Sequence, residues 1–157
     1  MKRIEMTLGG VMTPTPPPSV ALNDMAALAV DRMLEAHSGC VVVLAEEDQR
    51  MVGIFTERDF LCRVAAEGRD PETTPVGTVM TPNPETLGLN DCVTYAINKM
   101  VIGGYRNVPV TDDFGDVVGL VSVREVIRHL GHVFGALDTP ERLDSDIPEW
   151  TDVGGAG

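Results

Sequence analysis

The sequence predicts an α+β protein in which two β-α-β-β-α repeats pack sheet to sheet as one pseudo-two-fold module. The main observation is internal repetition. Three short motifs occur twice in the same order: VMTP at residues 11–14 and 79–82, LND at 22–24 and 89–91, and VGI or VGL at 52–54 and 118–120. A helical pattern follows each LND motif, and two β-branched runs follow each helical pattern. Chance similarity does not preserve such an order, so the chain is a tandem repeat.

The first helix of each repeat is predicted by apolar residues at helical spacing. Asn23 and Asn90 are the expected N-caps, because a short polar side chain can accept from the free amides of the first turn. Glycine is expected to end each helix, Gly39 in repeat 1 and Gly103–Gly104 in repeat 2. The residues expected to face the core are Ala26, Ala29, Val30, Met33 and Leu34, and Val93, Ala96, Ile97, Met100 and Val101.

A hairpin and a second helix complete each repeat. The β-branched runs lie at residues 41–44 and 51–55 and at 108–110 and 117–121, and short extended pieces near 19–20 and 85–87 add a strand before each first helix. The second helices begin at Thr56 and Ser122 and are expected to end at Gly68 and Gly131. Their expected inward residues are Phe60, Leu61 and Val64, and Val123, Val126, Ile127 and Leu130.

These elements divide the chain into five expected segments. They are an N-terminal segment 1–10, repeat 1 at 11–67, a linker 68–78, repeat 2 at 79–131, and an acidic, partly disordered tail 132–157. A unit of ~55 residues buries too little surface to be comfortably stable alone. We therefore expect the two repeats to pack by their sheets with the helices outside.

The composition limits which large partners the protein is expected to bind. The formal net charge is -12 and the pI is about 4.5, which excludes nucleic acid and disfavours an anionic membrane surface through electrostatic repulsion. No apolar run approaches the ~20 residues of a membrane span. The three cysteines lack metal-ligand spacing and are interpreted as buried free thiols in a reducing cytoplasm. A small phosphate ligand remains compatible, because a local cation or a helix start can hold an anion.

The segment GIFTERD, residues 53–59, carries the sharpest functional pattern. At this strand-to-helix junction, free amides and the Thr56 hydroxyl can donate to phosphate, Arg58 adds positive charge, and the Asp59 carboxylate can accept from ribose hydroxyls. The alternative is structural, because Ser/Thr-x-x-Asp/Glu is also the capping-box signature. Repeat 2 has GLVSVRE at the same place, where Ser122 and Glu125 form the pattern with a longer acid.

The sequence offers little for catalysis or a metal. His129 and His132 stand three residues apart, but no carboxylate or cysteine completes a site, so no metal is expected. No nucleophile with an adjacent base can be assembled either. We therefore expect a binding protein with no catalytic residues and no catalytic cofactor.

Several of these segments together resemble a tandem pair of cystathionine-β-synthase (CBS) domains, of the stand-alone bacterial or archaeal type. The resemblance covers residues 11–130 and rests on the paired MTP starts, the segment GYRNVPV at 104–110, and the GIFTERD and GLVSVRE closings. It implies β-α-β-β-α units that pair by their sheets. It also implies that AMP, ADP, ATP or an S-adenosyl ligand binds in two pseudo-symmetric clefts and that the protein forms a homodimer.

Carried over residue by residue, the resemblance assigns side chains to both clefts. The first cleft would use Thr56, Arg58, Asp59, Thr86, Tyr105, Arg106, Asn107 and Pro109. The second would use Ser38, Cys40, Val41, Ser122, Arg124 and Glu125. The second cleft departs from the family pattern, because Glu125 replaces the usual Asp and Val43 is taken as the counterpart of Pro109.

The expected function is regulatory. The module would bind an adenine nucleotide, with S-adenosylmethionine or NADH as further candidates, and signal energy or metabolite status through a shift between packed states to an unknown effector protein. The alternative is a ligand-free interaction or assembly module, in which the two closings serve only as helix caps.

Overall fold

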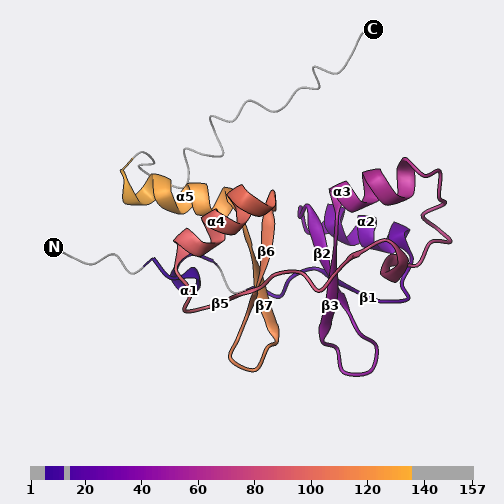
Figure 1. Ribbon diagram of the computed structural model, residues 1–157, viewed down its shortest axis with the longest axis horizontal. Coiled ribbons are helices and arrows are strands. Elements are labelled where there is room, and N and C mark those ends of the chain that lie inside the picture. The colour runs from indigo at the N-terminus through magenta and orange to yellow at the C-terminus, as the bar shows by residue number, and fades with distance from the viewer. Residues whose placement is uncertain (1–5, 13–14, 136–157) are drawn as a thin grey trace, which may run out of the picture.

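The computed structural model describes residues 6–12 and 15–135, so most of the expected tail lies outside the described residues. Its architecture is the α+β class that the sequence predicts. Figure 1 shows the hairpins β2–β3 and β6–β7 side by side near the middle of the molecule. Helices α4 and α5 lie on one outer side, and α2 and α3 lie on the other.

Each repeat contributes the predicted order of elements. Repeat 1 forms β1 (Ser19–Ala21), α2 (Ala26–Glu35), β2 (Cys40–Leu44), β3 (Met51–Thr56), α3 (Glu57–Asp59) and the π-helix η1 (Phe60–Ala65). Repeat 2 forms β5 (Leu87–Gly88), α4 (Val93–Gly103), β6 (Asn107–Thr111), β7 (Val117–Ser122) and α5 (Val123–Val133). In each sheet the first strand is parallel to the second and the hairpin is antiparallel.

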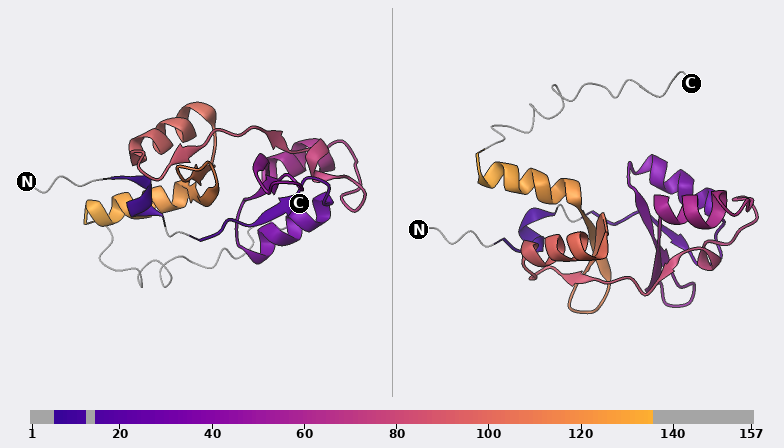
Figure 2. Two further views of the ribbon diagram at one scale, coloured as in Figure 1. Left: turned by 90° about the horizontal axis from the view of Figure 1, so that it is seen from below. Right: turned by 45° about the horizontal axis from the view of Figure 1, so that its top comes forward.

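The start of each repeat packs on the other repeat. Helix α1 (Leu8–Val11) joins repeat 2, where the Leu8 amide donates to the Asp91 carbonyl at 2.9 Å. The 3-10 helix η2 (Val76–Thr78) joins repeat 1 in the same way, with the Val76 amide 2.8 Å from the Asp24 carbonyl. Strand β4 (Thr81–Pro82) then pairs with β3 and becomes the fourth strand of the first sheet. Figure 2 shows α1 beside α4 and α5 in both views.

This exchange completes both hydrophobic cores. Leu8 and Met12 are buried in the core of repeat 2, whereas Val76 and Val79 are buried in the core of repeat 1. Residues that the sequence assigns to an N-terminal segment and to a linker are therefore parts of the packed structure. The core of each repeat is therefore completed by side chains from the segment at the start of the other repeat.

The repeated glycine of the VGI and VGL motifs makes room for methionine. A Cβ built on Gly53 would overlap Met80 Sδ, and a Cβ built on Gly119 would overlap Met12 Cε. Both methionines belong to the exchanged VMTP segments. The glycine is therefore required where a thioether from the other repeat's start crosses the strand, since methionine fills irregular gaps well.

Strand β2 is buried on both faces. Val41 and Val43 point into the core of repeat 1 with its helices. Val42 alternates with them, so it points to the opposite face of the sheet, and it is fully buried there although it is outside that core. This arrangement explains why residues 41–43 are continuously apolar instead of alternating with polar residues.

The predicted N-caps are wrong. Helices α2 and α4 begin later, after Met25 and Cys92, and neither cap residue provides a side-chain hydrogen bond. The aspartates of the two LND motifs instead fold back onto the preceding strand: Asp24 Oδ2 accepts from the Ala21 amide, and Asp91 Oδ2 accepts from the Gly88 amide, both at 2.7 Å. Each Asp side chain thus closes a local turn between strand and helix and does not cap the helix that follows.

Two of the predicted helix ends are also wrong. Helix α2 ends at Glu35, and the left-handed residue after it is His37, with φ 49°, rather than Gly39. Helix α5 continues through Gly131 to Val133. The other two glycines are confirmed, because Gly104 has φ 69° and Gly68 has φ 65°. A helix interior tolerates a single glycine when its neighbours pack well.

On each helix, the set of residues predicted to face the core includes one residue that is exposed. Leu34, Leu61, Val101 and Ile127 are 68%, 61%, 76% and 61% exposed. The buried positions are Ala26, Ala29 and Met33 on α2, Val64 on η1, Val93, Ala96 and Met100 on α4, and Val126 on α5. Each helix therefore packs on its core through a narrower arc than the sequence pattern suggests.

The exchange predicts an unusual sensitivity at the beginning of the chain. Replacing Leu8 by Ala should lower the free energy of unfolding by about 2–5 kcal/mol, because the side chain is fully buried in the core of repeat 2. Leu28→Ala is the control, since Leu28 is 37% exposed and should cost less. Urea unfolding followed by circular dichroism measures both, and equal small losses would argue against the exchange.

Candidate functional site

Thr56 and Asp59 form a complete capping box where β3 meets α3. The Thr56 hydroxyl accepts from the Asp59 amide at 3.1 Å, and Asp59 Oδ2 accepts from the Thr56 amide and the Thr56 hydroxyl at 3.0 Å each. The next amide, that of Glu57, donates to the Gly39 carbonyl at 3.1 Å. The structure therefore confirms the capping-box interpretation at this position. It also shows that donors expected to be free for phosphate are engaged within the chain.

The second carboxylate oxygen of Asp59 is engaged by residues that follow it in the chain. Asp59 Oδ1 accepts from the Thr81 hydroxyl at 3.0 Å and forms an ion pair with Arg63 Nη1 at 3.4 Å. Asp59 itself is only 6% exposed. The sequence predicts that this carboxylate accepts from ribose hydroxyls, and in this structure both of its oxygens already have partners within the chain. A buried carboxylate needs donors on both oxygens, and Thr81 and Arg63 supply them.

Repeat 2 carries the mirror arrangement at the start of α5. The Ser122 hydroxyl accepts from the Glu125 amide at 3.2 Å. Glu125 Oε2 in turn accepts from the Ser122 amide at 2.7 Å and from the Ser122 hydroxyl at 3.0 Å. The longer Glu side chain thus makes the same box as Asp59. The two helix starts are structurally equivalent even though their acids differ in length.

The two helix starts approach each other where β2 and β6 begin. A Cβ built on Gly39 would lie 3.7 Å from Asn107 Nδ2 and 3.7 Å from the Glu57 carboxylate. Asn107 belongs to repeat 2, so this is a direct approach between the repeats. The two repeats therefore approach each other closely where β2 and β6 begin.

The other residues assigned to the first cleft have separate local environments in the structure. The Arg106 carbonyl accepts from the Val123 amide at 3.0 Å, so its backbone adjoins the helix start of its own repeat. Tyr105 is 43% exposed, and its ring lies so close to Gly103 that a Cβ there would overlap it. Arg58 and Thr86 are exposed, whereas Pro109 is buried in β6.

The sheet register corrects one alignment between the repeats. Pro109 pairs with Leu120, and Val42 pairs with Ile54 at the equivalent place in repeat 1. The residue that corresponds to Pro109 is therefore Val42 rather than Val43. The offset of 67 residues that relates the two LND motifs still holds at this strand, and it becomes 66 only in the hairpin loop that follows, which is one residue shorter in repeat 2.

The second-cleft residues of repeat 1 have separate environments. The Ser38 hydroxyl donates to the Cys40 carbonyl at 2.9 Å, and Cys40 pairs with Thr56 across the hairpin. The Val41 side chain is buried in the core of repeat 1. Arg124 is exposed on the first turn of α5.

Sequence reasoning missed three residues at this site: Glu57, Arg63 and Thr81. Arg63 lies one turn after Asp59, so its spacing was a usable signal for an ion pair. Thr81 belongs to the repeated VMTP motif, but nothing local in the sequence brings it to Asp59. Its contact depends on the exchange between repeats.

Other features of the described residues give no second centre. A shallow hollow of about 370 Å³ is lined by Pro18, Ser19, Arg32, Glu35 and Ala36, none of which the sequence singles out. Among residues 6–12 and 15–135, no three His, Cys, Asp or Glu side chains gather as a metal site. Within the same ranges, no helix has the length and apolarity needed to span a bilayer.

The Cys40 and Cys62 thiols have opposite surroundings. Burial raises the pKa of the Cys40 thiol from 9.0 to about 12, the Ser38 hydrogen bond opposes this shift, and the Glu57 charge adds to it. Cys62 is exposed, contrary to the prediction that all three cysteines are buried. A disulfide reagent should therefore modify Cys62 readily and Cys40 only when the chain unfolds. Rapid modification of a Cys62→Ser, Cys92→Ser double variant would contradict this.

The same pKa shift predicts a pH dependence. Because the folded-state pKa of Cys40 exceeds the unfolded value of 9.0, the folded protein keeps a proton that the unfolded chain loses at higher pH. Stability from Cys40 should be complete below pH 9.0 and fall as the pH rises toward about 12. In urea titrations, Cys40→Ala should lose stability less steeply across this range than the wild type does.

Comparison with known proteins identifies the family. A family model described as CBS domain matches residues 8–66 and 76–132. The CBS domain-containing protein CBSCBSPB1 of Arabidopsis thaliana is 41% identical over 107 residues, which are 68% of this chain and 19% of the relative. The mitochondrial CBSX3 of the same plant is 35% identical over 113 residues, which are 70% of this chain and 54% of the relative. The chain thus spans about a fifth and about half of their lengths.

Solved structures share the fold. A CBS domain protein of unknown function, TA0289 from Thermoplasma acidophilum, has a TM-score of 0.73 and 25% identity over 82% of this chain and 71% of that one. The CBS domain protein PAE2072 from Pyrobaculum aerophilum, complexed with AMP, has a TM-score of 0.71 and 24% identity over 80% and 98%. The two family matches together cover most of the sequence, so the chain belongs to the CBS domain family and carries two CBS domains in tandem.

Proposed function

We propose that this protein is a regulatory module that binds an adenine-containing ligand where its two CBS repeats meet. The observation that carries the proposal is the junction itself. Two Ser/Thr-x-x-acid helix starts and the beginnings of β2 and β6 converge there, with Asn107 of one repeat beside Gly39 and Glu57 of the other. Polar groups from both halves at one place suit a ligand whose binding reports on the arrangement of the halves.

The fold is compatible with this ligand class. PAE2072 was solved with AMP, and the CBS domain pair of MJ0100 was solved with 5'-methylthioadenosine and S-adenosyl-L-methionine at a TM-score of 0.72 to this chain. Their identities of 24% and 23% support the architecture, not individual contacts. We therefore propose AMP, ADP or ATP as the ligand, with S-adenosylmethionine and NADH as further candidates.

We assign roles in the first cleft by chemistry. Thr56 and Arg58 would donate to the phosphates, and Asp59 would accept from the ribose hydroxyls. The base side would be lined by Thr86, Tyr105, Arg106, Asn107 and Pro109. The second cleft would use Ser38, Cys40, Val41, Ser122, Arg124 and Glu125.

Ligand binding at Asp59 requires a local exchange of partners. Its Oδ2 holds the cap, and its Oδ1 is occupied by Thr81 and Arg63. A sugar hydroxyl is a donor of the same kind as the Thr81 hydroxyl, so replacement leaves the buried carboxylate satisfied.

The second candidate function is a ligand-free interaction or assembly module. The fully partnered Asp59 favours it, because both closings then act simply as helix caps. Under this alternative the exposed helix faces would provide the working surface. The two candidates differ in one measurable respect, which is whether a nucleotide stabilises the protein.

Thermal melts and calorimetric titrations with AMP, ADP, ATP, NADH and S-adenosylmethionine test the proposal. A ligand at 100 times its Kd should stabilise the fold by about 2.7 kcal/mol and raise the Tm by several degrees. Asp59→Asn should remove this rise, because an amide cannot accept from two ribose hydroxyls as a carboxylate does.

Asp91→Asn is the matched control for that variant. Asp91 also bonds a backbone amide through Oδ2, but it lies in the turn before α4 and away from the junction. Its Tm rise on adding nucleotide should match that of the wild type. If no ligand of the panel changes the wild-type melt at millimolar concentration, the assembly function is favoured instead.

We further propose that the protein works as a homodimer in the cytoplasm and passes its ligand state to an effector protein. Exposed apolar side chains on α4 and α5, including Val101, Ile102 and Ile127, supply a surface for association. The three free cysteines suit a reducing compartment. Sedimentation should show a dimer that Ile102→Glu dissociates, whereas Phe114→Glu, at an exposed hairpin tip, should not.

A further inference from the structure

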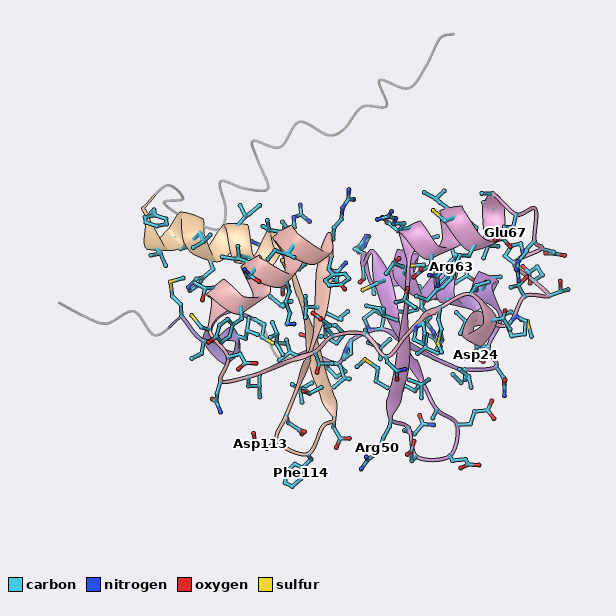
Figure 3. The ribbon with its side chains drawn as sticks, viewed as in Figure 1. Asp24, Arg50, Arg63, Glu67, Asp113 and Phe114 are labelled. Carbon is cyan, nitrogen blue, oxygen red and sulfur yellow. The ribbon has the colours of Figure 1, made fainter. Side chains whose placement is uncertain are left out.

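The segment that begins repeat 2 is held to repeat 1 by a small polar cluster around Asp59. Thr81 donates to Asp59 Oδ1 at 3.0 Å. Arg63 Nη1 reaches the Met80 carbonyl at 2.6 Å, the Val79 carbonyl at 3.2 Å and Asp59 Oδ1 at 3.4 Å. One carboxylate oxygen and one guanidinium nitrogen thus fasten residues 79–81, which we call the docking segment, to the helix that follows the GIFTERD motif. Figure 3 labels Arg63 beneath that helix.

The docking segment also has contacts that do not involve Asp59. Strand β4 pairs Thr81 with Ile54 and Pro82 with Gly53, and the Asn83 amide donates to the Val52 carbonyl at 3.1 Å. Met80 packs over Gly53, and Val79 is buried in the core of repeat 1. The apolar part of the segment is therefore anchored independently. Loss of the polar cluster should loosen its polar end without releasing the whole strand.

The helix at this place has an unusual geometry. After the three residues of α3 the chain continues as the π-helix η1, in which the Ala66 amide donates to the Leu61 carbonyl at 2.9 Å. Arg63 lies within this wide turn. Short π-helical stretches are rare and are frequently found at functional sites. Here the side chain so placed is the one that holds the Met80 and Val79 carbonyls.

We propose that Thr81 and the ligand compete for the same oxygen of Asp59, so that ligand binding and docking of residues 79–81 are negatively coupled. This inference rests on the proposed function. The Asp59 side chain is 8% exposed, so a ribose hydroxyl reaches Oδ1 by replacing the Thr81 hydroxyl rather than by joining it. Because coupling is reciprocal, docking of the segment lowers the affinity for the ligand, and ligand binding lowers the equilibrium constant for docking by the same factor.

Through this coupling, ligand binding at Asp59 can affect other parts of the molecule. The docking segment leads directly into β5 and α4 of repeat 2, while β4 is a strand of the first sheet. A change at Thr81 therefore acts on the connection between the two repeats. Ligand occupancy is converted into a change in the exchanged segment, which is the element that both repeats share.

Thr81→Val tests the competition. Valine has nearly the same shape as threonine and removes the hydroxyl donor, so the ligand-free state loses the contact that the ligand must replace. Calorimetric titration should show AMP binding about 10-fold more tightly than to the wild type, the size expected for one hydrogen bond to a charged group. Structural damage alone would weaken binding, so the direction of the change separates the two explanations.

The control is Thr78→Val. The Thr78 hydroxyl donates to the Pro75 carbonyl at 2.7 Å in the same exchanged region and does not contact Asp59. Its AMP affinity should equal that of the wild type. Arg63→Gln should tighten AMP binding in the same direction as Thr81→Val, whereas Arg69→Gln, which removes only an exposed pair with Glu67, should not.

Hydrogen exchange on the wild type gives an independent readout. Saturating AMP should speed exchange of the Met80 amide, which lies next to Thr81, and leave the Val42 amide, which bonds to the Pro18 carbonyl within the first sheet, unchanged. If the wild type binds AMP but Thr81→Val binds no more tightly and the exchange rates stay constant, the competition is refuted and the proposed function stands. If neither protein binds AMP, both fail. Binding by Thr81→Val alone would show the competition in its strongest form.

Discussion

The structure depends on one constraint, which is that neither repeat holds a complete core of its own. Leu8 and Met12 fill the core of the repeat that follows much later in the chain, and Val76 and Val79 fill the core of the repeat that precedes them. Backbone hydrogen bonds fix both exchanged segments in the same register. The sheets, the glycines beneath the methionines and the cluster at Asp59 all take their positions from this arrangement.

The same constraint brings the candidate site together. Without the start of repeat 2 over its helix, Asp59 Oδ1 would keep only the ion pair with Arg63 and lose the Thr81 hydrogen bond, and removing a donor from a buried carboxylate is costly. The capping box alone uses only Oδ2. The acid is thus shared between the stability of its own helix, the attachment of the next repeat and the proposed ligand, and these roles can be exchanged because each partner is a hydrogen-bond donor.

Local pattern in the sequence was sufficient for most elements, because helical and strand periodicities act over a few residues. The hairpins, the helix starts at Thr56 and Ser122 and the turn at Gly104 were all predictable in this way. The errors have a common cause in contacts from elsewhere. Asp24 turns back to Ala21 instead of supporting a cap at Asn23, and Thr81 reaches Asp59 across 22 residues through the exchange. The periodicity of the sequence does not encode such contacts. The Ser/Thr-x-x-Asp/Glu motif also occurs at ordinary helix caps, so it does not show which additional partners Asp59 has.

Because of the exchange, the sequence repeats do not have the same boundaries as the two packed units, each of which has one sheet and one core. The first spatial unit runs without interruption from β1 to β4, whereas the second is assembled from α1 and from the elements after β4. In topological terms the first unit is nested inside the second, like an insertion in a loop. A fragment cut at the sequence repeat, residues 8–66, would therefore carry a helix that belongs to its neighbour and lack its own last strand. The boundary that preserves a whole sheet and core follows Pro82 instead.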